Sequence, residues 1–362
     1  MSRASRRPVV IAAGGTGGHV VPALAVAAEL KSRNVPVVWF GTRTGLEASM
    51  VPSNNIEMVW IDVAGLRGKT LLQTLLGPLK LLRAIAQCVK NFWSLKPRAV
   101  LGMGGFVSGP AALAALMMRK PLVLHEQNAV AGMTNRYLSA SATRVFSAWP
   151  NVFRASSNAV VVGNPVNASM EKLAHSDSGV SSDTAQPLRV LVVGGSRGAR
   201  ALNKIVPEAI ALMQAAVSVQ HQTGQDDFEN VREKYKDASE AEVVVTPFID
   251  DMTSAYQQAD IVVCRSGAMT VTELGALGLP SILVPFPYAV DDHQTLNAKQ
   301  LAEAGAAQLM PEATLNTRNL SQILDELALN RQKLALMSKA ARSCFVPGAA
   351  AAVAHAILEV SR

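Results

Sequence analysis

Apolar runs of strand length alternate along the chain with short glycine-rich or polar turns. Residues 8–13 and 36–41 are two such runs, and the apolar stretch 22–30 between them begins with proline, which favours the first turn of a helix. Continuous apolar runs are typical of parallel strands that are buried on both faces. The pattern therefore predicts a strand–helix–strand unit with a right-handed crossover.

The same order of elements returns in the second half of the chain. Residues 188–193 are an apolar run, 194–199 a glycine-rich turn and 201–213 a helical stretch. Further strands are predicted at 99–101, 122–124, 145–147, 160–162, 218–221, 243–245, 261–263 and 282–285, and a closing helix at 349–360. Two nucleotide-binding-type units in one chain predict an α/β fold, with two Rossmann-like parallel-sheet domains that face each other across a cleft.

Composition narrows the class of protein. The 362 residues suit two domains, and 49% hydrophobic with 17% charged residues is typical of a folded protein. Three widely spaced cysteines, Cys88, Cys264 and Cys344, form no C-x-x-C pair, which indicates a reducing compartment and neither a disulfide framework nor a structural metal. No window approaches the ~18 apolar residues that a membrane-spanning helix needs, so we expect a soluble or peripheral protein.

The net charge of +7 is unevenly distributed. Residues 1–166 contain 18 Lys and Arg against 5 Asp and Glu, whereas residues 167–362 contain 16 against 22. The first half is expected to be drawn to an anionic surface. Nucleic acid is not expected as a partner, because aromatic residues make up only 5% and no nucleic-acid-binding motif occurs. An anionic membrane explains the asymmetry at least as well.

A stripe of apolar residues at helical spacing lies in the basic half. Its members are Leu72, Leu75, Leu76, Leu79, Leu82, Ile85, Ala86, Val89 and Trp93. Such stripes usually face a core. The interspersed Lys80, Arg83 and Lys90, together with Phe92 and Trp93 near the end, favour partial insertion into a lipid interface.

Two glycine-rich turns, 14–18 and 102–109, follow predicted strands in the first half. Without side chains, their backbone can approach a bound phosphate closely. The first turn does not complete the G-x-G-x-x-G dinucleotide motif, because Val20 occupies the last position. Arg43 could still hold a 2′-phosphate, so an NADP-dependent oxidoreductase stays an alternative. Residues 68–70 end like a P-loop, but Val63 replaces its first glycine, which argues against ATP binding there.

The segment 266–273 reads as a tight turn and helix start after the apolar run 261–264. A turn of small residues there leaves backbone N–H groups unpaired at the positive end of the helix dipole, which suits a diphosphate. Glu273 could then accept hydrogen bonds from a ribose diol. The plain alternative is a helix capped by Ser266 or Thr270, with Glu273 as a partner of the dipole.

No D-x-D triplet occurs, since the acidic pairs 226–227, 250–251 and 291–292 are adjacent. We therefore expect no catalytic metal. A diphosphate leaving group would instead be neutralised by helix termini and by Arg265 or Arg197.

Two side chains at predicted carboxyl ends of strands are candidate general bases. His19 ends the first glycine turn, where an imidazole could accept a proton near neutral pH, or could merely cap the helix or bond the loop. Glu126 is the second candidate, in the polar run 125–128. Asn128 in the same run offers a donor and an acceptor to a sugar.

Taken in order along the chain, these motifs closely resemble the MurG family of bacterial N-acetylglucosaminyltransferases. The resemblance lies in segments 14–19, 104–110, 125–128, 163–166, 194–199 and 264–273, and it covers nearly the whole chain. It implies a GT-B fold, with an acceptor- and membrane-binding domain of residues 1–166, joined by the C-terminal helix 346–362, and a donor-binding domain of residues 167–345.

The resemblance also implies a reaction. N-acetylglucosamine (GlcNAc) would pass with inversion from UDP-GlcNAc to the 4-hydroxyl of the N-acetylmuramic acid (MurNAc) unit of undecaprenyl-diphospho-MurNAc-pentapeptide (lipid I), giving lipid II without a cofactor. The expected place is peripheral, at the cytoplasmic face of the bacterial inner membrane. Other cell-wall and division proteins are expected among its partners.

The implied site residues follow by position. The donor contacts are Thr16, Gly17, Gly18, Asn128, Asn167, Ser196, Ile249, Ala268, Met269, Thr270, Val271, Thr272, Glu273 and Gln294. Glu273 would meet the ribose and Ile249 the uracil. Gly104, Gly105 and Ser108 would hold the acceptor diphosphate, and His19 or Glu126 would be the base. Asn167 stands where the family commonly has arginine, so a cationic donor contact is missing or replaced, with Arg197 placed to compensate.

Three further alternatives stay open at this point. On the same fold, a UDP-GlcNAc 2-epimerase or a glycolipid glucosyltransferase would keep the donor motif but not the basic apolar stripe together with the first-half glycine turns. A non-catalytic nucleotide-sugar binder would keep its function without His19.

Overall fold

The computed structural model describes residues 7–63, 77–174, 183, 185–195, 198–237 and 241–361. The chain forms two compact units, Met1–Ala168 with Val346–Arg362, and Ser169–Phe345. We call them unit 1 and unit 2. The sequence-based junction between residues 166 and 167 lies two residues before this division.

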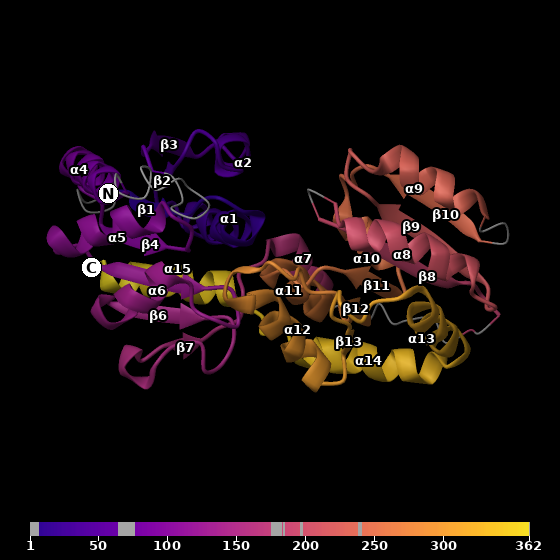
Figure 1. Ribbon diagram of the computed structural model, residues 1–362. Helices are drawn as coiled ribbons and strands as arrows, with labels where there is room; N and C mark the ends of the chain where they lie inside the picture. Colours follow the sequence, from indigo (N-terminus) through magenta and orange to yellow (C-terminus); the bar gives the residue numbers. More distant parts are fainter. Residues whose placement is uncertain are drawn as a thin grey trace. The chain divides into compact units, whose positions relative to one another are not determined.

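Unit 1 contains a seven-stranded parallel sheet with the strand order β3-β2-β1-β4-β5-β6-β7 (Figure 1). Its strands are β1 (Val9–Ala12), β2 (Val37–Gly41), β3 (Glu57–Trp60), β4 (Ala99–Gly102), β5 (Leu122–Glu126), β6 (Arg144–Ser147) and β7 (Val160–Val161). Its helices are α1 (Gly17–Ser32), α2 (Glu47–Ser53), α4 (Gly77–Leu95), α5 (Ser108–Met117), α6 (Met133–Leu138) and α15 (Ala349–Val360).

Both faces of this sheet are covered, which explains the continuous apolar runs. Val9 and Ile11 of β1 join one core cluster with Val353 and Ile357 of α15. The intervening Val10 belongs to the cluster on the other face, with residues of α4 and α5. Successive side chains of a strand point to opposite faces, so an apolar residue is needed at every position. In Figure 1, the yellow α15 accordingly lies among the indigo and magenta elements of unit 1.

Unit 2 contains a six-stranded parallel sheet with the order β10-β9-β8-β11-β12-β13. Its strands are β8 (Leu188–Val193), β9 (Val217–Gln222), β10 (Glu242–Thr246), β11 (Ile261–Cys264), β12 (Ser281–Leu283) and β13 (Ala307–Leu309). Its helices are α8 (Arg200–Ala211), α9 (Phe228–Lys234), α10 (Met252–Gln258), α11 (Ala268–Leu277), α12 (His293–Glu303), α13 (Thr317–Leu329) and α14 (Arg331–Ser343). The short helix α7 (Ala168–Ala174) begins at the division between the units.

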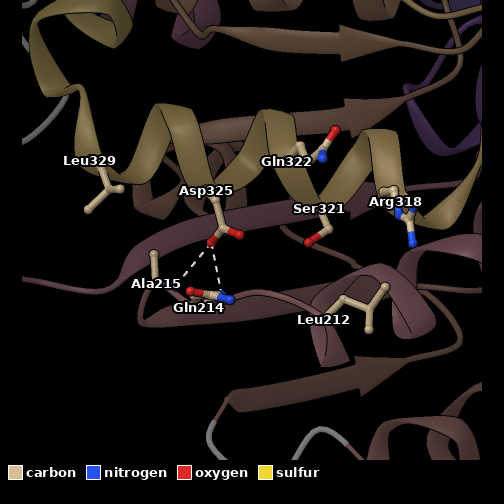
Figure 2. A pocket seen from close by; sticks show the side chains of 8 residues that line it. All are labelled: Leu212, Gln214, Ala215, Arg318, Ser321, Gln322, Asp325 and Leu329. Carbon is tan, nitrogen blue, oxygen red and sulfur yellow. Dashed lines mark hydrogen bonds between the residues drawn. The ribbon is translucent and has the colours of Figure 1, made fainter.

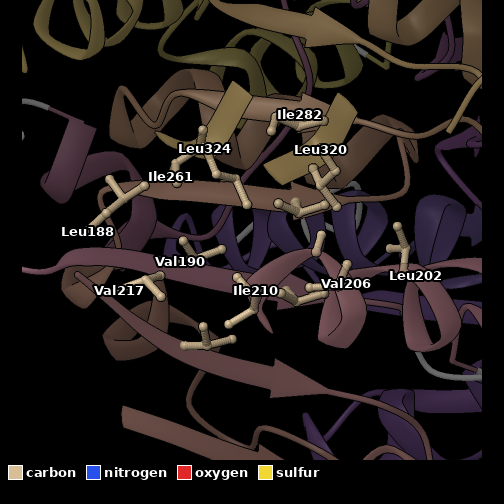
Figure 3. Packing of buried hydrophobic residues seen from close by; sticks show 14 of the residues in the cluster. Leu188, Val190, Leu202, Val206, Ile210, Val217, Ile261, Ile282, Leu320 and Leu324 are labelled. Atoms are coloured by element: carbon tan, nitrogen blue, oxygen red, sulfur yellow. The ribbon is translucent and has the colours of Figure 1, made fainter. Parts of the chain in front are cut away.

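One core cluster of unit 2 forms where helices pack on one face of its sheet. Figure 3 shows Val190 of β8 among Val206 and Ile210 of α8 and Leu320 and Leu324 of α13. These helical residues recur at intervals of four, so each helix presents one apolar stripe to the sheet. The predicted α/β fold with two Rossmann-like parallel sheets is confirmed.

The sequence pattern missed two strands and misplaced one helix start. β3 and β13 are short edge strands, and they were missed because Glu57 and Gln308 interrupt their apolar runs. α1 begins at Gly17 rather than at Pro22, so the second half of the glycine turn forms its first turn.

Part of the predicted apolar stripe lies on α4. The part of the stripe in residues 71–76 lies outside the described residues. Ala84, Cys88 and Phe92 are its buried face, and the Phe92 ring centroid lies 5.4 Å from that of Phe40. The expectation that Phe92 inserts into lipid is therefore wrong. By contrast, Leu79, Leu82 and Trp93 are 67%, 63% and 70% exposed. Among the described residues, no helix combines the length and apolar character needed to cross a membrane.

The neighbours Phe92 and Trp93 give a matched test of this packing. We expect Phe92→Ala to lower the free energy of unfolding by about 3–5 kcal/mol, because it removes a fully buried aromatic ring. Trp93→Ala should change it by less than about 0.5 kcal/mol. Urea denaturation followed by circular dichroism measures both, and equal losses would contradict the assigned orientation of α4.

Candidate functional site

Each sheet reverses its strand order at one point, and the glycine-rich turns lie there. In unit 1 the reversal falls between β1 and β4, which are followed by the turns 13–16 and 103–107. In unit 2 it falls between β8 and β11, which are followed by residues 194–199 and 265–267. Ligands of open α/β sheets bind at the carboxyl ends of the strands next to such a switch point. The topology therefore places the predicted phosphate-binding turns where ligand sites form.

In unit 1, the turns after β1 and β4 pack directly against each other. Gly105 has a φ of +76°, and a Cβ there would collide with the carbonyl oxygen of Gly14. Gly104 has a φ of +93°, and a Cβ there would come within 2.8 Å of the His19 ring. Only glycine fits either position without strain.

The hydroxyl of Ser108 ties these two turns together from inside. It donates to the Ala12 carbonyl at 3.1 Å and accepts from the Gly104 N–H at 3.3 Å, and the residue is fully buried. Ser108 thus fixes the conformation of the turn. Within this turn Gly104 is buried, whereas Gly105 is partly exposed.

Sequence analysis missed Glu47, a fully buried carboxylate beneath the glycine turn. Its oxygens accept hydrogen bonds from the Gly15 N–H at 3.0 Å, the Thr42 N–H at 2.9 Å and the Thr42 hydroxyl at 2.8 Å. These donors come from separate loops, so only the fold brings them together. The one available signal was an acidic residue at the start of α2 in a half of the chain with few others.

The N-terminus of α1 offers backbone donors at the switch point. Thr16 is the N-cap residue, with extended φ of −111°, and it is exposed and makes no side-chain cap bond. The N–H groups of Gly17 and Gly18 belong to the first turn, which has no intrahelical acceptors. α1 therefore directs two N–H groups and the positive end of its dipole toward this edge of the sheet.

The structure brings His19 and the polar run 125–128 together. His19 Nδ1 lies 3.1 Å from Gln127 Oε1, and Gln127 Nε2 lies 3.2 Å from His125 Nδ1. His125 Nε2 in turn lies 2.9 Å from the Gly163 carbonyl oxygen. Burial lowers the pKa of His125 to about 4, so this imidazole is neutral.

Glu126, the other candidate base, is 2% exposed and has four hydrogen-bond donors around it. Oε1 accepts from the backbone and side-chain nitrogens of Asn128, both at 3.1 Å. Oε2 accepts from the Gly132 N–H at 3.0 Å and from Asn135 Nδ2 at 2.9 Å. The carboxylate thus fastens the segment 128–135 to the end of β5.

In unit 2, α11 begins with donors that no side chain caps. Its N-cap is Gly267 in an extended conformation, so the alternative in which Ser266 or Thr270 caps the helix is wrong. Ala268, Met269, Val271 and Thr272 are all less than 9% exposed, so their side chains are largely shielded from solvent. The Val271 N–H already donates to the Gly267 carbonyl at 3.0 Å.

Gln294 lies beside this turn, at the start of α12. The Ser266 hydroxyl donates to the Gln294 carbonyl at 2.8 Å, and Asn297 Nδ2 donates to the Ser266 carbonyl at 3.2 Å. The Gln294 side chain accepts from the Phe286 N–H at 2.9 Å. α11 and α12 are therefore joined at the end of β11.

Glu273 is held by Tyr256, which sequence analysis did not single out. The Tyr256 hydroxyl donates to Glu273 Oε2 at 3.1 Å, and the tyrosine is 2% exposed. Burial raises the pKa of Glu273 to about 7, and the hydrogen bond from Tyr256 opposes this rise. Ile249, which is 8% exposed, follows β10 at the carboxyl end of the same sheet.

Arg265, which was expected to help neutralise a diphosphate, is already paired within unit 2. Its guanidinium pairs with Glu312 at 2.6 Å and donates to the carbonyls of Val284 at 3.2 Å and Pro285 at 3.0 Å. Its charge is thus compensated inside unit 2. Ser196 and Arg197 lie outside the described residues, and Asn167 is exposed just before α7.

A surface hollow of about 450 Å³ in unit 2 lies away from these turns (Figure 2). Asp325 of α13 accepts there from the N–H groups of Gln214 and Ala215, both at 3.0 Å. These two residues connect α8 to the amino end of β9, which is the opposite edge of the sheet. Within the described ranges, no three His, Cys, Asp or Glu side chains lie together as a metal site would require.

Comparison with known proteins agrees with this arrangement. Residues 9–147 match the glycosyltransferase family 28 N-terminal domain, and residues 189–353 match its C-terminal domain. The chain is 50% identical, over 92% of both chains, to a Chromohalobacter salexigens protein and 48% identical, over 98% of both chains, to one from Methylococcus capsulatus. Both are named "UDP-N-acetylglucosamine--N-acetylmuramyl-(pentapeptide) pyrophosphoryl-undecaprenol N-acetylglucosamine transferase".

The crystal structure of Acinetobacter baumannii MurG is similar throughout, with 41% identity, a TM-score of 0.86, and coverage of 98% of this chain and 99% of that one. The chain belongs to the MurG family. The family resemblance drawn from the sequence motifs is thereby confirmed. MurG membership also makes an NADP-dependent oxidoreductase untenable, and Arg43, which that alternative needed, lies 5.0 Å over the Trp60 ring.

Proposed function

We propose that this protein transfers GlcNAc from UDP-GlcNAc to the 4-hydroxyl of the MurNAc unit of lipid I, with inversion, to give lipid II. The proposal rests on 48–50% sequence identity, over nearly the full length of the chain, with relatives that are named as transferases of this activity. The two switch points, each with glycine turns and helix N-termini, supply the anion sites that a nucleotide donor and a diphosphate-bearing acceptor require. Neither the epimerase nor the glucosyltransferase alternative has comparable support.

The donor site is proposed around the N-terminus of α11. Backbone N–H groups of Ala268, Met269 and Thr270 would hold the diphosphate, since the dipole and unpaired donors of a helix start favour an anion. Glu273, oriented by Tyr256, would accept from the ribose hydroxyls. Further donor contacts are proposed from Thr16, Gly17, Gly18, Asn128, Asn167, Ser196, Ile249, Val271, Thr272 and Gln294.

For the general base we propose His19 rather than Glu126. Attack by the acceptor hydroxyl needs a base with a free lone pair close to the reacting oxygen. The carboxylate of Glu126 is buried and accepts four hydrogen bonds, whereas His19 is only partly buried and stands at the switch point. Glu126 then supports the site by fixing the segment that carries Asn128.

The acceptor diphosphate is proposed to bind at the glycine turns of unit 1. The backbone N–H of Gly105 can meet a phosphate closely, because no side chain lies in between. The Gly104 N–H already donates to Ser108, so Gly104 would contribute through the conformation that it gives the turn. Ser108 would contribute by holding the turn in shape, as its hydroxyl is already engaged.

The exposed face of α4 is proposed to bind the anionic cytoplasmic surface of the inner membrane. Leu79, Leu82 and Trp93 are exposed apolar side chains, and Lys80 and Lys90 lie on exposed positions of the same helix. Buried apolar area combined with attraction to anionic lipid headgroups is how an amphipathic helix binds at an interface. Contacts with other cell-wall and division proteins stay a prediction.

His19→Ala tests the base. We expect turnover to fall by about 10²–10⁴-fold, because general-base assistance is lost, while the affinity for UDP-GlcNAc changes little. Transfer of radiolabelled GlcNAc to a lipid I analogue measures turnover, and calorimetry measures donor affinity. His355→Ala, at an exposed histidine of α15, is the control and should be fully active. Unaltered turnover of His19→Ala would remove His19 as the base.

Donor affinity should depend on pH through Glu273. An ionised carboxylate accepts from hydroxyls more strongly than a neutral carboxyl does, and with a pKa of about 7 the group is increasingly neutral as pH falls. Affinity should therefore be highest above pH 8 and decrease below pH 7, by roughly 10–100-fold in all. Tyr256→Phe removes a bond that lowers this pKa, so its loss of affinity should begin at higher pH.

Calorimetry with UDP-GlcNAc between pH 5.5 and 8.5 measures this dependence separately from catalysis. Glu273→Gln is the control, because a side chain that does not titrate should flatten the profile. A flat wild-type profile would contradict the proposed contact with ribose.

The membrane proposal predicts that Leu82→Ser and Trp93→Ser weaken binding to anionic vesicles by reducing the inserted apolar area. Flotation with vesicles containing phosphatidylglycerol measures binding, which should also decrease with added salt. Leu336→Ser, at a 69% exposed position on α14 of unit 2, is the matched control. Binding that is insensitive to both salt and the α4 substitutions would refute the role of this helix.

A further inference from the structure

We propose that the buried pair His125 and Gln127 sets the tautomer of His19, so that its Nε2 carries the lone pair that receives a proton. The four groups form one hydrogen-bonded chain, from the Gly163 carbonyl through His125 and Gln127 to His19. Neither His125 nor Gln127 touches the reacting atoms, so they are positioning residues. The catalytic consequence rests on the proposed function, whereas the tautomer itself does not.

The chain has a fixed direction because it begins at a carbonyl oxygen. Gly163 O can only accept, so His125 must carry its proton on Nε2, 2.9 Å away. His125 is fully buried, and burial lowers its pKa to about 4 although the Gly163 carbonyl and the charge of Glu126 oppose this, so the ring is neutral. A neutral imidazole has one N–H, and therefore His125 Nδ1 is an acceptor.

The orientation of the Gln127 amide follows from that acceptor. Its NH₂ group must face His125 Nδ1, at 3.2 Å, because the reversed amide would set two acceptors against each other. Nε2 also has the His125 carbonyl at 3.4 Å and Met103 Sδ at 3.9 Å as neighbours. Gln127 is fully buried. Its backbone carbonyl accepts a hydrogen bond from Asn164 Nδ2 at 3.0 Å, so the backbone is fixed as well as the side chain.

The remaining step reaches His19. Gln127 Oε1 is an acceptor, so the His19 nitrogen 3.1 Å away, Nδ1, must carry the proton. In the neutral ring, Nε2 then holds the lone pair, and none of the described residues hydrogen-bonds to it. Gly104 packs close against the ring, where any Cβ would meet it at 2.8 Å, so the ring plane is restricted too.

This arrangement serves both protonation states of the base. When the acceptor hydroxyl attacks the anomeric carbon, its proton passes to Nε2 and the electron pair of the broken C–O bond leaves with UDP. The Nδ1–H continues to donate to Gln127 Oε1 throughout. A carboxylate performs this orienting role in the Ser-His-Asp triad. Here the neutral amide of Gln127 performs this role, and the buried His125 determines the orientation of that amide.

Nitrogen NMR of the intact chain labelled with ¹⁵N-histidine reads the tautomer directly, with the His19 signals identified by their loss in His19→Ala. At a pH where His19 is neutral, we expect a protonated Nδ1 and an unprotonated Nε2. Gln127→Met, which keeps the length of the side chain but not its acceptor, should give a mixture of both tautomers. Gln87→Met, at a glutamine of α4 that bonds Asp62 instead, is the matched control and should leave His19 unchanged.

The same variants separate positioning from folding. We expect Gln127→Met to lower kcat by roughly 10–100-fold, part of the contribution of a general base, with the dissociation constant of UDP-GlcNAc within about twofold of wild type. If Gln127→Met does not fold, His125→Gln provides a second test. It keeps an N–H for Gly163 O but removes the acceptor for Gln127, and it should also mix the tautomers.

Two results would overturn the proposal: a wild-type His19 protonated on Nε2, or substitutions at Gln127 and His125 that leave both tautomer and kcat unchanged. Full turnover of His19→Ala is a different failure. It would remove His19 as the base, and hence the proposed mechanism, while the measured tautomer would still decide whether His125 and Gln127 act on it.

Discussion

The contact between the backbone of Gly105 and the carbonyl of Gly14 is the constraint on which the site in unit 1 depends. Two turns can approach this closely only where neither carries a side chain, and both Gly104 and Gly105 also have positive φ angles. Once the turns touch, the other features of the site follow. Ser108 can bridge the turn after β4 to the end of β1, and the His19 ring can lie over Gly104.

In both units, the described residues at the switch point present oriented backbone N–H groups. In unit 2 Arg265 is paired with Glu312, and α11 begins without a side-chain cap. In unit 1 the carboxylate of Glu47 is buried under the glycine turn, where it accepts the Gly15 N–H. Oriented N–H groups and helix dipoles are then the common source of positive potential. Such donors are fixed by the fold and need no reorganisation when charge develops on a leaving diphosphate.

The sequence was sufficient for the fold class and for the positions of the glycine-rich turns, because both depend on local patterns. Continuous apolar runs marked the buried strands, and glycines marked the turns that follow β1 and β4. Two of the four edge strands, β3 and β13, were missed, because a half-exposed strand tolerates polar residues and Glu57 and Gln308 interrupt their apolar runs. The same limit applied to α4, where a regular stripe could not distinguish the buried Phe92 from the exposed Trp93.

Contacts between residues that are distant in the sequence could not be predicted from local patterns. Glu47 draws its donors from two loops, and Tyr256 reaches Glu273 from another helix. Gly15 lies 32 residues from Glu47 and Tyr256 lies 17 residues from Glu273, so no local pattern connects either pair. Arg265 shows the converse, since its sequence position suggested a free cation and only the fold reveals Glu312 beside it.

The side chains of residues 125–128 alternate between two faces and have different partners on each face. β5 ends at Glu126, and in an extended chain side chains two residues apart point the same way. His125 and Gln127 accordingly bond each other and reach His19, while Glu126 and Asn128 bond each other on the other side. A shift of one residue in this register would exchange the two pairs and place the carboxylate beside His19. The proposed role of His19 as base, with an amide rather than a carboxylate behind it, therefore depends on the register of β5.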